Sequence, residues 1–239
     1  MRRFTGIIFA VLSMMLLAAC GGTREPVTYT SLEQLQDLNG GNLPVTERDA
    51  EGHITSFEGI ISDFKIENEE QARLAFEGVL TIFDIDSPDY TFETSYQKWR
   101  GNLLVNFKQY YKGAYVEPSN FQMVVDSGDN RTVTITNNLF YGCEEIDMSS
   151  IITAEQAKEY VSEYRRGEVT FEEKEPFLLI TDMSYGDLSY VSQDPNSKVE
   201  TTGTFPAWDV YIKAGGGFEE IYVNALTGEI VNEQFRGIE

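Results

Sequence analysis

Few side chains in this 239-residue chain could perform catalysis. His53 is the only histidine, and it lies in Glu51-Gly52-His53, a segment that we expect to form a turn. A zinc peptidase needs two histidines four residues apart on one helix face with a glutamate between them. A Ser-His-Asp triad needs an imidazole beside its nucleophile. The sequence supports neither arrangement, so we assign no catalytic residue and expect a protein that is not an enzyme.

The carboxylates are abundant, but their spacing does not indicate a metal site. Asp84, Asp86 and Asp89 are conceivable calcium ligands, yet Pro88 stands where an EF-hand requires glycine and no glutamate closes the loop. We expect these acids to cap the end of a helix. Pairs such as Glu144-Glu145 follow from the acidic composition alone, so we predict no metal and no cofactor.

The N-terminus has the pattern of a secretory signal. Arg2 and Arg3 precede an apolar run from Ile7 to Ala19, which ends in Leu17-Ala18-Ala19-Cys20. The run is too short to span a bilayer as a helix, which favours a cleaved signal over a permanent anchor. The segment resembles the N-terminus of bacterial lipoproteins. That resemblance implies cleavage between Ala19 and Cys20 and lipid attachment to Cys20.

A lipidated Cys20 would anchor the mature chain to the cell membrane or the outer membrane, on the extracytoplasmic side, without a transmembrane helix. We expect residues 1–19 to be the signal and residues 20–27 to be a tether. Cys143 then has no cysteine partner, so no intramolecular disulfide can form, and we expect its thiol to be buried.

The charge of the mature chain excludes two classes of ligand. The full chain has 18 basic and 39 acidic residues, and residues 1–19 contain two of the basic ones. Removing them leaves 16 basic against 39 acidic residues, a net charge of −23. Such a surface repels phosphate backbones and anionic lipid headgroups. We therefore expect no nucleic-acid binding, and membrane contact only through the anchor.

Three helices are predicted from capping residues followed by apolar spacing of three and four. Each begins with a hydroxyl or amide side chain and has a glutamine three residues later. The three pairs are Ser31 with Gln34, Asn68 with Gln71, and Thr153 with Gln156. The third helix should bury Ala157, Tyr160, Val161 and Tyr164.

Between and after the helices, apolar residues alternate with polar ones, which predicts antiparallel hairpins. The alternating segments lie at residues 103–107, 121–125, 133–135, 208–212 and 221–225. Turns are expected at Lys112-Gly113, Asp126–Asn130 and Gly215–Gly217. The polar stretch from Asp182 to Thr204 is predicted to be a surface loop. We therefore predict that each half of the chain forms a helix packed on an antiparallel β-meander.

The segment Phe107-Lys108-Gln109-Tyr110-Tyr111-Lys112-Gly113, followed by Phe121 to Asp126, resembles the fungalysin/thermolysin propeptide (FTP) domain. The match covers most of residues 40–140. A second part, Ile152 to Ala157 with Pro206 to Val210 and Tyr222 to Ile230, is similar to a PepSY domain. In that hairpin, Asn224 replaces the more frequent aspartate, and Gly228 is expected to supply a positive φ.

These resemblances imply an α+β fold of cystatin-like architecture with two domains, each a helix packed on an antiparallel sheet. We place an FTP-like domain at residues 28–145 and a PepSY-like domain at residues 146–239. Secreted metallopeptidase precursors carry both modules in this order. In them a peptidase domain follows, whereas this sequence ends at Glu239 without its motif.

The resemblance implies a binding protein, and we expect an inhibitor or folding chaperone of a secreted metallopeptidase. The alternatives are a regulatory module that binds a membrane sensor kinase, as in YycH/YycI-type regulators, and a binding module of unknown ligand. Candidate partner contacts are Tyr110, Tyr111 and Tyr115. The tail from Val231 is expected to be free, so that Glu233 or the carboxylate of Glu239 could approach a zinc ion.

Overall fold

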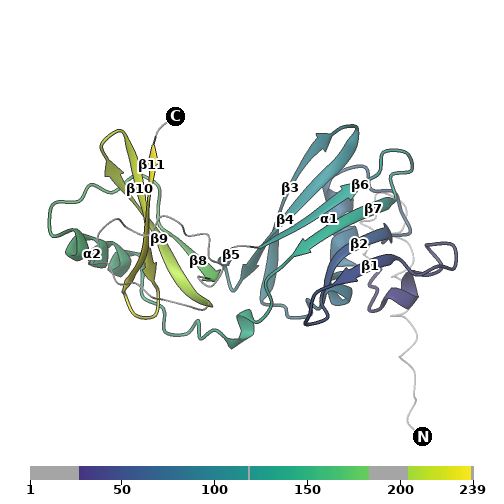
Figure 1. Cartoon of the computed structure of the whole chain (residues 1–239), viewed down its shortest axis with the longest axis horizontal. Helices are drawn as coiled ribbons and strands as arrows, with labels where there is room; N and C mark the ends of the chain where they lie inside the picture. The colour runs from purple at the N-terminus through teal and green to yellow at the C-terminus, as the bar shows by residue number, and fades with distance from the viewer. Residues whose placement is uncertain (1–26, 118, 183–203, 238–239) are drawn as a thin grey trace, which may run out of the picture.

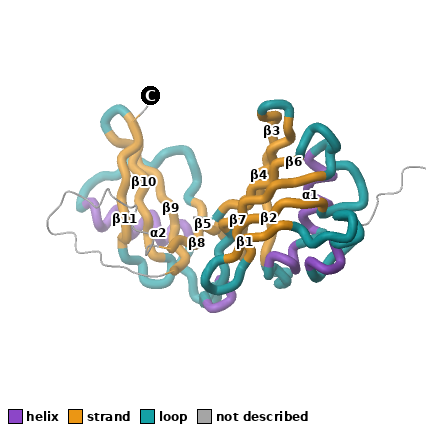
Figure 2. The backbone as a smooth tube through the Cα atoms, turned by 45° about the vertical axis from the view of Figure 1, so that its right-hand side comes forward, coloured by secondary structure: helices purple, strands orange, loops and turns teal. Residues whose placement is uncertain are grey.

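A single sheet forms the body of the molecule and bends into two lobes (Figure 1). The computed structural model describes residues 27–117, 119–182 and 204–237. Figure 1 shows the lobes diverging from β5 and β8, with α2 on the side of its lobe that faces away from the other lobe. The tube in Figure 2 shows the same division from a second direction.

Eleven strands form this sheet, in the order β1-β2-β7-β6-β4-β5-β8-β9-β10-β11, and β3 pairs with β4 beside that path. In the first lobe the strands are β1 (Val45–Arg48), β2 (Ile54–Ile60), β3 (Tyr90–Trp99), β4 (Asn102–Tyr111), β5 (Ala114–Glu117), β6 (Asn120–Val125) and β7 (Thr132–Asn138). In the second lobe they are β8 (Phe177–Asp182), β9 (Thr204–Ala214), β10 (Gly217–Asn224) and β11 (Ile230–Gly237).

In the first lobe, α1 (Glu69–Glu77) packs on the sheet through its apolar face. Asn68 caps the helix by accepting a hydrogen bond from the Gln71 backbone N–H, as the sequence predicts. Phe76 stacks on Phe107 of β4 with ring centroids 4.0 Å apart, and both rings are fully buried. The main core of the first lobe is built around these aromatic contacts.

The predicted N-terminal helix differs from the observed one. Residues Leu32–Leu35 form one turn of 3₁₀ helix, and the Ser31 side chain makes no capping hydrogen bond. The Gln34 side chain instead accepts from the Thr30 backbone N–H at 2.6 Å. The prediction of a capping box at Ser31 and Gln34 is therefore wrong. Two further 3₁₀ turns lie at Leu80–Phe83 and Cys143–Glu145.

In the second lobe, α2 (Ala154–Arg165) lies against β9, β10 and β11. Thr153 and Gln156 form the complete capping box that the sequence predicts. Ala157 and Val161 are buried, but Tyr160 and Tyr164 are 38% and 39% exposed, so the prediction that both tyrosines are core residues is wrong. A helix on a three-strand surface buries a narrow stripe, and these tyrosines lie at its margin.

The two lobes are joined by a parallel pair, β5 with β8, in which Val116 lies opposite Ile180. The sequence predicts only antiparallel hairpins, so this pairing corrects it. Ile180 is fully buried in the hydrophobic cluster of the first lobe, whereas its neighbour Leu179 is buried in a cluster of the second lobe. One strand thus contributes to the first lobe's core and to one of the two buried clusters of the second lobe.

The α+β fold class predicted from the sequence is confirmed, since two helices pack on a mostly antiparallel sheet. The division between residues 145 and 146 stays a prediction. Within the described residues, no helix combines the length and the apolar character that a membrane crossing requires. The predicted surface loop falls almost entirely on residues 183–203, which lie outside the described residues.

Candidate functional site

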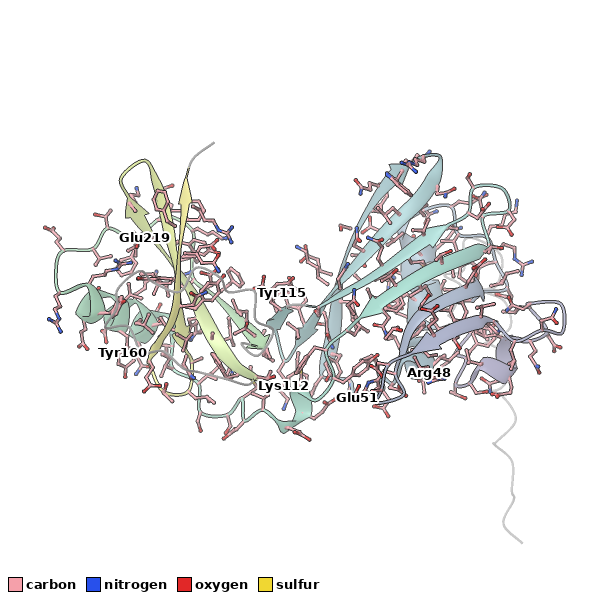
Figure 3. All side chains as sticks on the ribbon, viewed as in Figure 1. Arg48, Glu51, Lys112, Tyr115, Tyr160 and Glu219 are labelled. Carbon is pink, nitrogen blue, oxygen red and sulfur yellow. The ribbon has the colours of Figure 1, made fainter. Side chains whose placement is uncertain are left out.

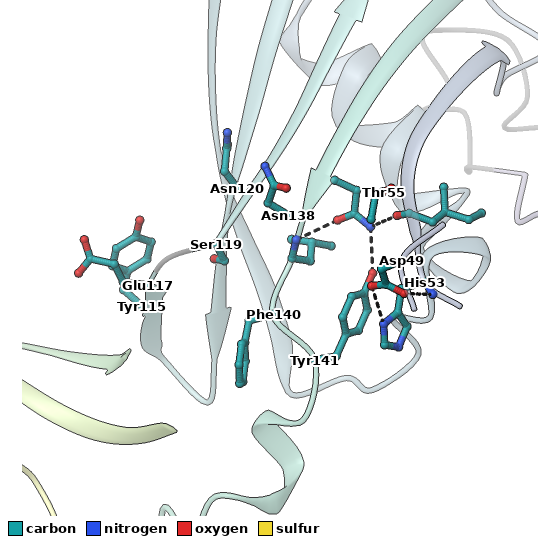
Figure 4. A pocket seen from close by; sticks show the side chains of 13 residues that line it. Asp49, His53, Thr55, Tyr115, Glu117, Ser119, Asn120, Asn138, Phe140 and Tyr141 are labelled. Atoms are coloured by element: carbon teal, nitrogen blue, oxygen red, sulfur yellow. Dashed lines mark hydrogen bonds and ion pairs between the residues drawn. The ribbon is translucent and has the colours of Figure 1, made fainter. Parts of the chain in front are cut away.

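An open cleft of about 730 Å³ lies at the ends of the first lobe's central strands. Its lining is rich in aromatic and amide side chains and comes from β2, β5, β6, β7 and the segments that follow β1 and β7. The lining residues are Asp49, His53, Ile54, Thr55, Tyr115, Glu117, Ser119, Asn120, Asn137, Asn138, Leu139, Phe140 and Tyr141. Figure 4 shows Tyr115 and Glu117 at one end and His53 with Tyr141 at the other.

Two buried amides hold the wall of the cleft. Gln109 of β4 is fully buried; its amide nitrogen donates to the Phe140 carbonyl and its oxygen accepts from the Phe140 backbone N–H, both at 2.9 Å. The amide of Asn137 donates to the Ile54 carbonyl and to the Tyr141 hydroxyl, and its oxygen accepts from the Leu139 backbone N–H. The segment 139–141 is therefore fixed before any ligand arrives.

His53 and Tyr141 form the far wall. Their rings stack with centroids 3.9 Å apart and 13° between planes. The Tyr141 hydroxyl donates to the Phe83 carbonyl at 3.0 Å, which fixes the ring. His53 Nδ1 lies 3.3 Å from Asp49 Oδ2. Desolvation opposes ionisation of Asp49, but hydrogen bonds from the His53 and Gly52 backbones outweigh it and lower the pKa of that carboxyl.

This pair does not complete a catalytic triad with the serine of the cleft. The Ser119 hydroxyl donates to the Val116 carbonyl and is therefore committed to its own loop. A nucleophile requires a hydrogen bond to its base. Among the described residues, no group of three or more His, Cys, Asp or Glu side chains is placed to hold a metal ion. The cleft presents hydrogen-bonding side chains and aromatic rings.

Several polar groups of the cleft lack partners. Asn120 and Asn138 face each other across the β6–β7 pair, and both are exposed. Within the described part of the chain, neither side-chain amide makes a hydrogen bond, nor does the hydroxyl of Thr55. Desolvation and, next, the carboxylate of Glu220 raise the pKa of Glu117. These groups are available to a ligand.

A second exposed surface lies at the tip of the β3–β4 hairpin, which we call the hairpin tip and define as Tyr96, Lys98, Trp99 and Arg100. Arg100 and Gly101 have positive φ values of 50° and 90°, so two residues make the turn between Trp99 and Asn102. Tyr96 is 56% exposed and Trp99 is 47% exposed. The Arg100 guanidinium lies 4.6 Å from the centre of the Trp99 ring.

The three predicted tyrosine contacts have different environments. Tyr111 is 2% exposed and packs in the first core beside Tyr90, so the prediction that it contacts a partner is wrong. Tyr110 is half-buried, and its hydroxyl donates to Glu93. Tyr115 is half-buried and lines the cleft near the junction of the lobes (Figure 3). Alternation along a hairpin places successive residues on opposite faces, which separates Tyr110 from Tyr111.

The predicted free tail is wrong for residues 231–237. Val231 to Gly237 belong to β11, which pairs with β10 along its length. The Glu233 carboxylate lies 2.9 Å from Arg165 of α2, which also contacts Glu219, so Glu233 is engaged within the molecule. Glu239, the Ala19–Cys20 cleavage site, and the signal and tether apart from Val27 lie outside the described residues.

Cys143 is fully buried, as predicted. Burial raises the pKa of its thiol to about 11, against a weaker opposing effect of a hydrogen bond with Tyr90. Of the three acids predicted to cap a helix end, Asp84 occupies the C-terminal cap of the 3₁₀ turn Leu80–Phe83 with a φ of 60°, whereas Asp89 pairs with Lys112.

Neither the cleft nor the hairpin tip was predicted from the sequence. Gln109 lies in the hairpin segment Phe107–Gly113, but nothing in the sequence shows that its partner is Phe140, 31 residues away. Arg100-Gly101 between two alternating segments was a usable signal for a short turn.

Comparisons with known proteins give no family. No protein family model matches this chain, and no curated protein matches its sequence. Among solved structures, the C-terminal domain of YpeB from Bacillus megaterium aligns with a TM-score of 0.38 and 13% identity, over 82% of this chain and 83% of that chain. A protein of Clostridium difficile 630, described provisionally as a lipoprotein, aligns with a TM-score of 0.27 and 13% identity, over 62% of this chain and 84% of that chain. Likenesses this distant say nothing about function.

Proposed function

We propose that this chain is a lipid-anchored, extracytoplasmic binding protein that contacts a protein partner through the hairpin tip. The observation that carries the proposal is the exposure of Tyr96, Trp99 and Arg100 at the end of one protruding hairpin, where Tyr96 and Trp99 lie on opposite faces of β3 and a partner can enclose the tip from both sides. Tryptophan, tyrosine and arginine are the residue types most enriched among those that dominate interface energies. A large exposed tryptophan gains most when a partner covers it.

The charge of the hairpin tip differs from that of the whole chain. Lys98 and Arg100, two residues apart, give the hairpin tip a positive charge, whereas the full chain has a net charge of −21. A partner with an apolar recess beside acidic groups would match the tip, and the acidic remainder of the chain would keep it from binding elsewhere. This contrast supports a single orientation of docking.

The partner that we propose is an extracytoplasmic metallopeptidase, which the chain would inhibit or help to fold. The support is the resemblance to the two modules of metallopeptidase precursors. Because Glu233 is engaged by Arg165, the hairpin tip replaces the tail as the proposed contact. The alternative partner is a membrane sensor kinase, supported by the same PepSY-like hairpin.

Attachment through Cys20 would raise the local concentration of the chain near a partner on the same membrane. We expect a Cys20→Ser variant to remain unprocessed and to lose its lipid, as shown by metabolic labelling with a fatty acid. Normal labelling of that variant would end the anchoring proposal.

The partner is tested by placing a photo-crosslinking amino acid at position 99 in cells that contain the native envelope. The crosslinked protein is identified by mass spectrometry, and its binding to the purified chain is then measured. We expect a metallopeptidase whose affinity falls at least about tenfold with Trp99→Ala, the scale of a loss at a central interface residue.

The matched control is Phe235→Ala, which removes another exposed aromatic residue, 58% exposed, on the second lobe. That variant should bind as the unmodified chain does. Capture of a sensor kinase would support the alternative partner, and an inhibition assay separates inhibitor from chaperone. Equal effects of the two substitutions would contradict the hairpin-tip proposal.

A further inference from the structure

The cleft of the first lobe carries a second inference, independent of the hairpin tip. Trp99 and Arg100 are not among its lining residues. Its volume of about 730 Å³ falls within the range of sites for small ligands, roughly 300–1,000 Å³. Its lining combines aromatic rings with short polar side chains, as in ligand sites where a few polar groups fix the orientation of the ligand.

The charge of the lining restricts the ligand. Asp49 and Glu117 are acidic, and no lysine or arginine is among the described residues that line the cleft, although Lys108 Nζ lies 6.0 Å from the centre of the Tyr115 ring and the charge of Arg236 acts on Glu117. Asp49 already accepts hydrogen bonds from the His53 backbone and ring, which leaves Glu117 as the carboxylate without a hydrogen-bond partner in the described part of the chain. An anionic ligand would be repelled, so the cleft suits a ligand without negative charge.

The free amides define the chemistry of recognition. Each amide offers two donors and an acceptor, and Asn120 and Asn138 present theirs side by side across one strand pair. The Thr55 hydroxyl adds a further donor and acceptor, and Glu117 adds a strong acceptor. A ligand that uses all of these groups must itself be dense in hydroxyl or amide groups.

The rings supply an apolar surface beside these polar groups. Tyr115 and Phe140 are half-buried and line the cleft between Glu117 and Tyr141. The Gln109 side-chain amide hydrogen-bonds to both the carbonyl and the N–H of Phe140. Binding of a ligand therefore does not incur the entropy cost of ordering this segment. A ligand with alternating polar edges and C–H faces, such as a sugar ring, can stack on the rings and hydrogen-bond to the amides.

A peptide fits this cleft less well. β2, β5, β6 and β7 are all internal to the sheet, and only their ends at the cleft, such as Glu117 of β5 and Asn120 of β6, lack a second strand neighbour. A peptide could therefore pair with these strands only over such short ends, which gives little of the main-chain hydrogen bonding by which a strand adds to a sheet. Recognition must depend on side chains, which favours a ligand that carries its own hydroxyl groups.

We propose that this cleft binds an uncharged oligosaccharide through the amides of Asn120 and Asn138, the carboxylate of Glu117 and the rings of Tyr115 and Phe140. Figure 4 shows the two asparagines between the Glu117 end and the His53 end, where they can contact the middle of such a chain.

The test uses the purified mature chain and neutral tetrasaccharides of glucose, mannose, galactose and N-acetylglucosamine, with tetralysine as a cationic peptide probe. Saturation-transfer NMR identifies the probes that bind, and calorimetry measures their affinity. We expect at least one tetrasaccharide to bind, and the Asn120→Ala/Asn138→Ala double variant to weaken it at least about tenfold.

The matched controls are Asn42→Ala, an exposed asparagine outside the cleft, and Trp99→Ala at the hairpin tip. Both should bind the sugar unchanged, and thermal unfolding should show that the double variant remains folded. Failure of all tetrasaccharides at millimolar concentration, unchanged binding by the double variant, or binding of tetralysine alone would each overturn the inference. None of these outcomes bears on the partner of the hairpin tip.

Discussion

Gly228 has a backbone conformation and a neighbour that together exclude a larger residue. Its φ is +78°, as the sequence predicts for this turn, and a Cβ atom at this position would lie 2.6 Å from the Tyr160 ring. Gly113 has a similar φ of +84° but no atom within 4 Å of such a Cβ. An alanine at position 113 would therefore add backbone strain alone, whereas an alanine at position 228 would add backbone strain and a steric overlap with Tyr160.

We expect Gly113→Ala to lower the free energy of unfolding by about 1–2 kcal/mol, the cost of a left-handed conformation for alanine. Gly228→Ala should cost about 1–3 kcal/mol more, because the ring of Tyr160 must move. Urea denaturation measures both. In the Gly228→Ala background, Tyr160→Ala should recover that additional cost, and equal effects of the two glycine substitutions would contradict the contact.

Asp209 of β9 is a buried carboxyl in an unfavourable environment. It is 2% exposed, and its Oδ1 has no hydrogen-bond partner in the described part of the chain. Burial raises the pKa of Asp209 to about 7; a hydrogen bond from the Tyr211 hydroxyl opposes this shift, and the Glu220 carboxylate adds to it. The folded protein therefore holds this proton up to neutral pH.

This raised pKa predicts that stability falls as pH rises. The unfolded chain releases the proton near pH 4 and the folded chain only near pH 7, so the unfolded state binds fewer protons between these values. From pH 5 to pH 8, the unmodified chain should lose about 2–3 kcal/mol relative to Asp209→Asn. Urea denaturation of both proteins across this pH range measures the difference, and parallel pH profiles would contradict it.

The sequence predicts well which apolar residues are buried, but it predicts poorly the position of a charged residue whose ion-pair partner is distant in the chain. The burial of Cys143, Ala157 and Val161 followed from the sequence. The position of Glu233 did not, because its contact is Arg165, 68 residues earlier in the chain. Local spacing carries no information about such a pair.

At the scale of elements, the capping residues give a direct comparison. Thr153 forms a full capping box at α2, whereas Ser31 makes no capping hydrogen bond at its 3₁₀ turn. We expect Thr153→Ala to lower the free energy of unfolding by about 1 kcal/mol. Ser31→Ala should stay within about 0.5 kcal/mol of the unmodified chain. Urea denaturation tests the pair, and equal effects would mean that the Thr153 hydrogen bonds contribute nothing in solution.

Several strands were not predicted, and three of them show the physical reason. β8 reads Phe-Leu-Leu-Ile-Thr-Asp without alternation, because Leu179 and Ile180 are buried on opposite faces in different clusters. β3 extends beyond the core, so its outer half is exposed on both faces and shows no apolar period. β11 is an outer strand with polar and charged residues, which resembled a tail.

The hairpins around Lys112-Gly113, Asp126–Asn130 and Gly215–Gly217 were predicted correctly, since each lies between two alternating segments. Alternation and turn residues are local properties. The cleft depends instead on β2, β5, β6 and β7 meeting at one end of the sheet, which no single segment specifies.

At the scale of the whole molecule, the open question is whether the two lobes unfold together. The predicted division at residues 145 and 146 requires two units with their own cores. The parallel β5–β8 pair and the burial of Ile180 in the first lobe's core instead connect the lobes through one strand. Unfolding one core should therefore remove the support of the other.

The chain's two tryptophans provide a reporter for each lobe, since Trp99 lies on β3 and Trp208 lies on β9. Trp208 is half-buried, and its indole N–H donates to the Ile152 carbonyl at 2.9 Å, so its fluorescence depends on the packing of α2. Trp208→Phe leaves a reporter for the first lobe, and Trp99→Phe leaves one for the second.

We expect both single-tryptophan proteins to unfold in urea at the same denaturant concentration, because β8 contributes side chains to the first lobe's core and to the second lobe's cluster of Leu179, Phe205, Ala207 and Val231. Ile180→Ala should destabilise the molecule by about 2–5 kcal/mol and shift both transitions together. Leu179→Ala, the adjacent residue in the second lobe's cluster, should do the same. If Ile180→Ala shifts only the Trp99 signal and Leu179→Ala only the Trp208 signal, the lobes unfold independently, and the division into residues 28–145 and 146–239 describes two autonomous domains.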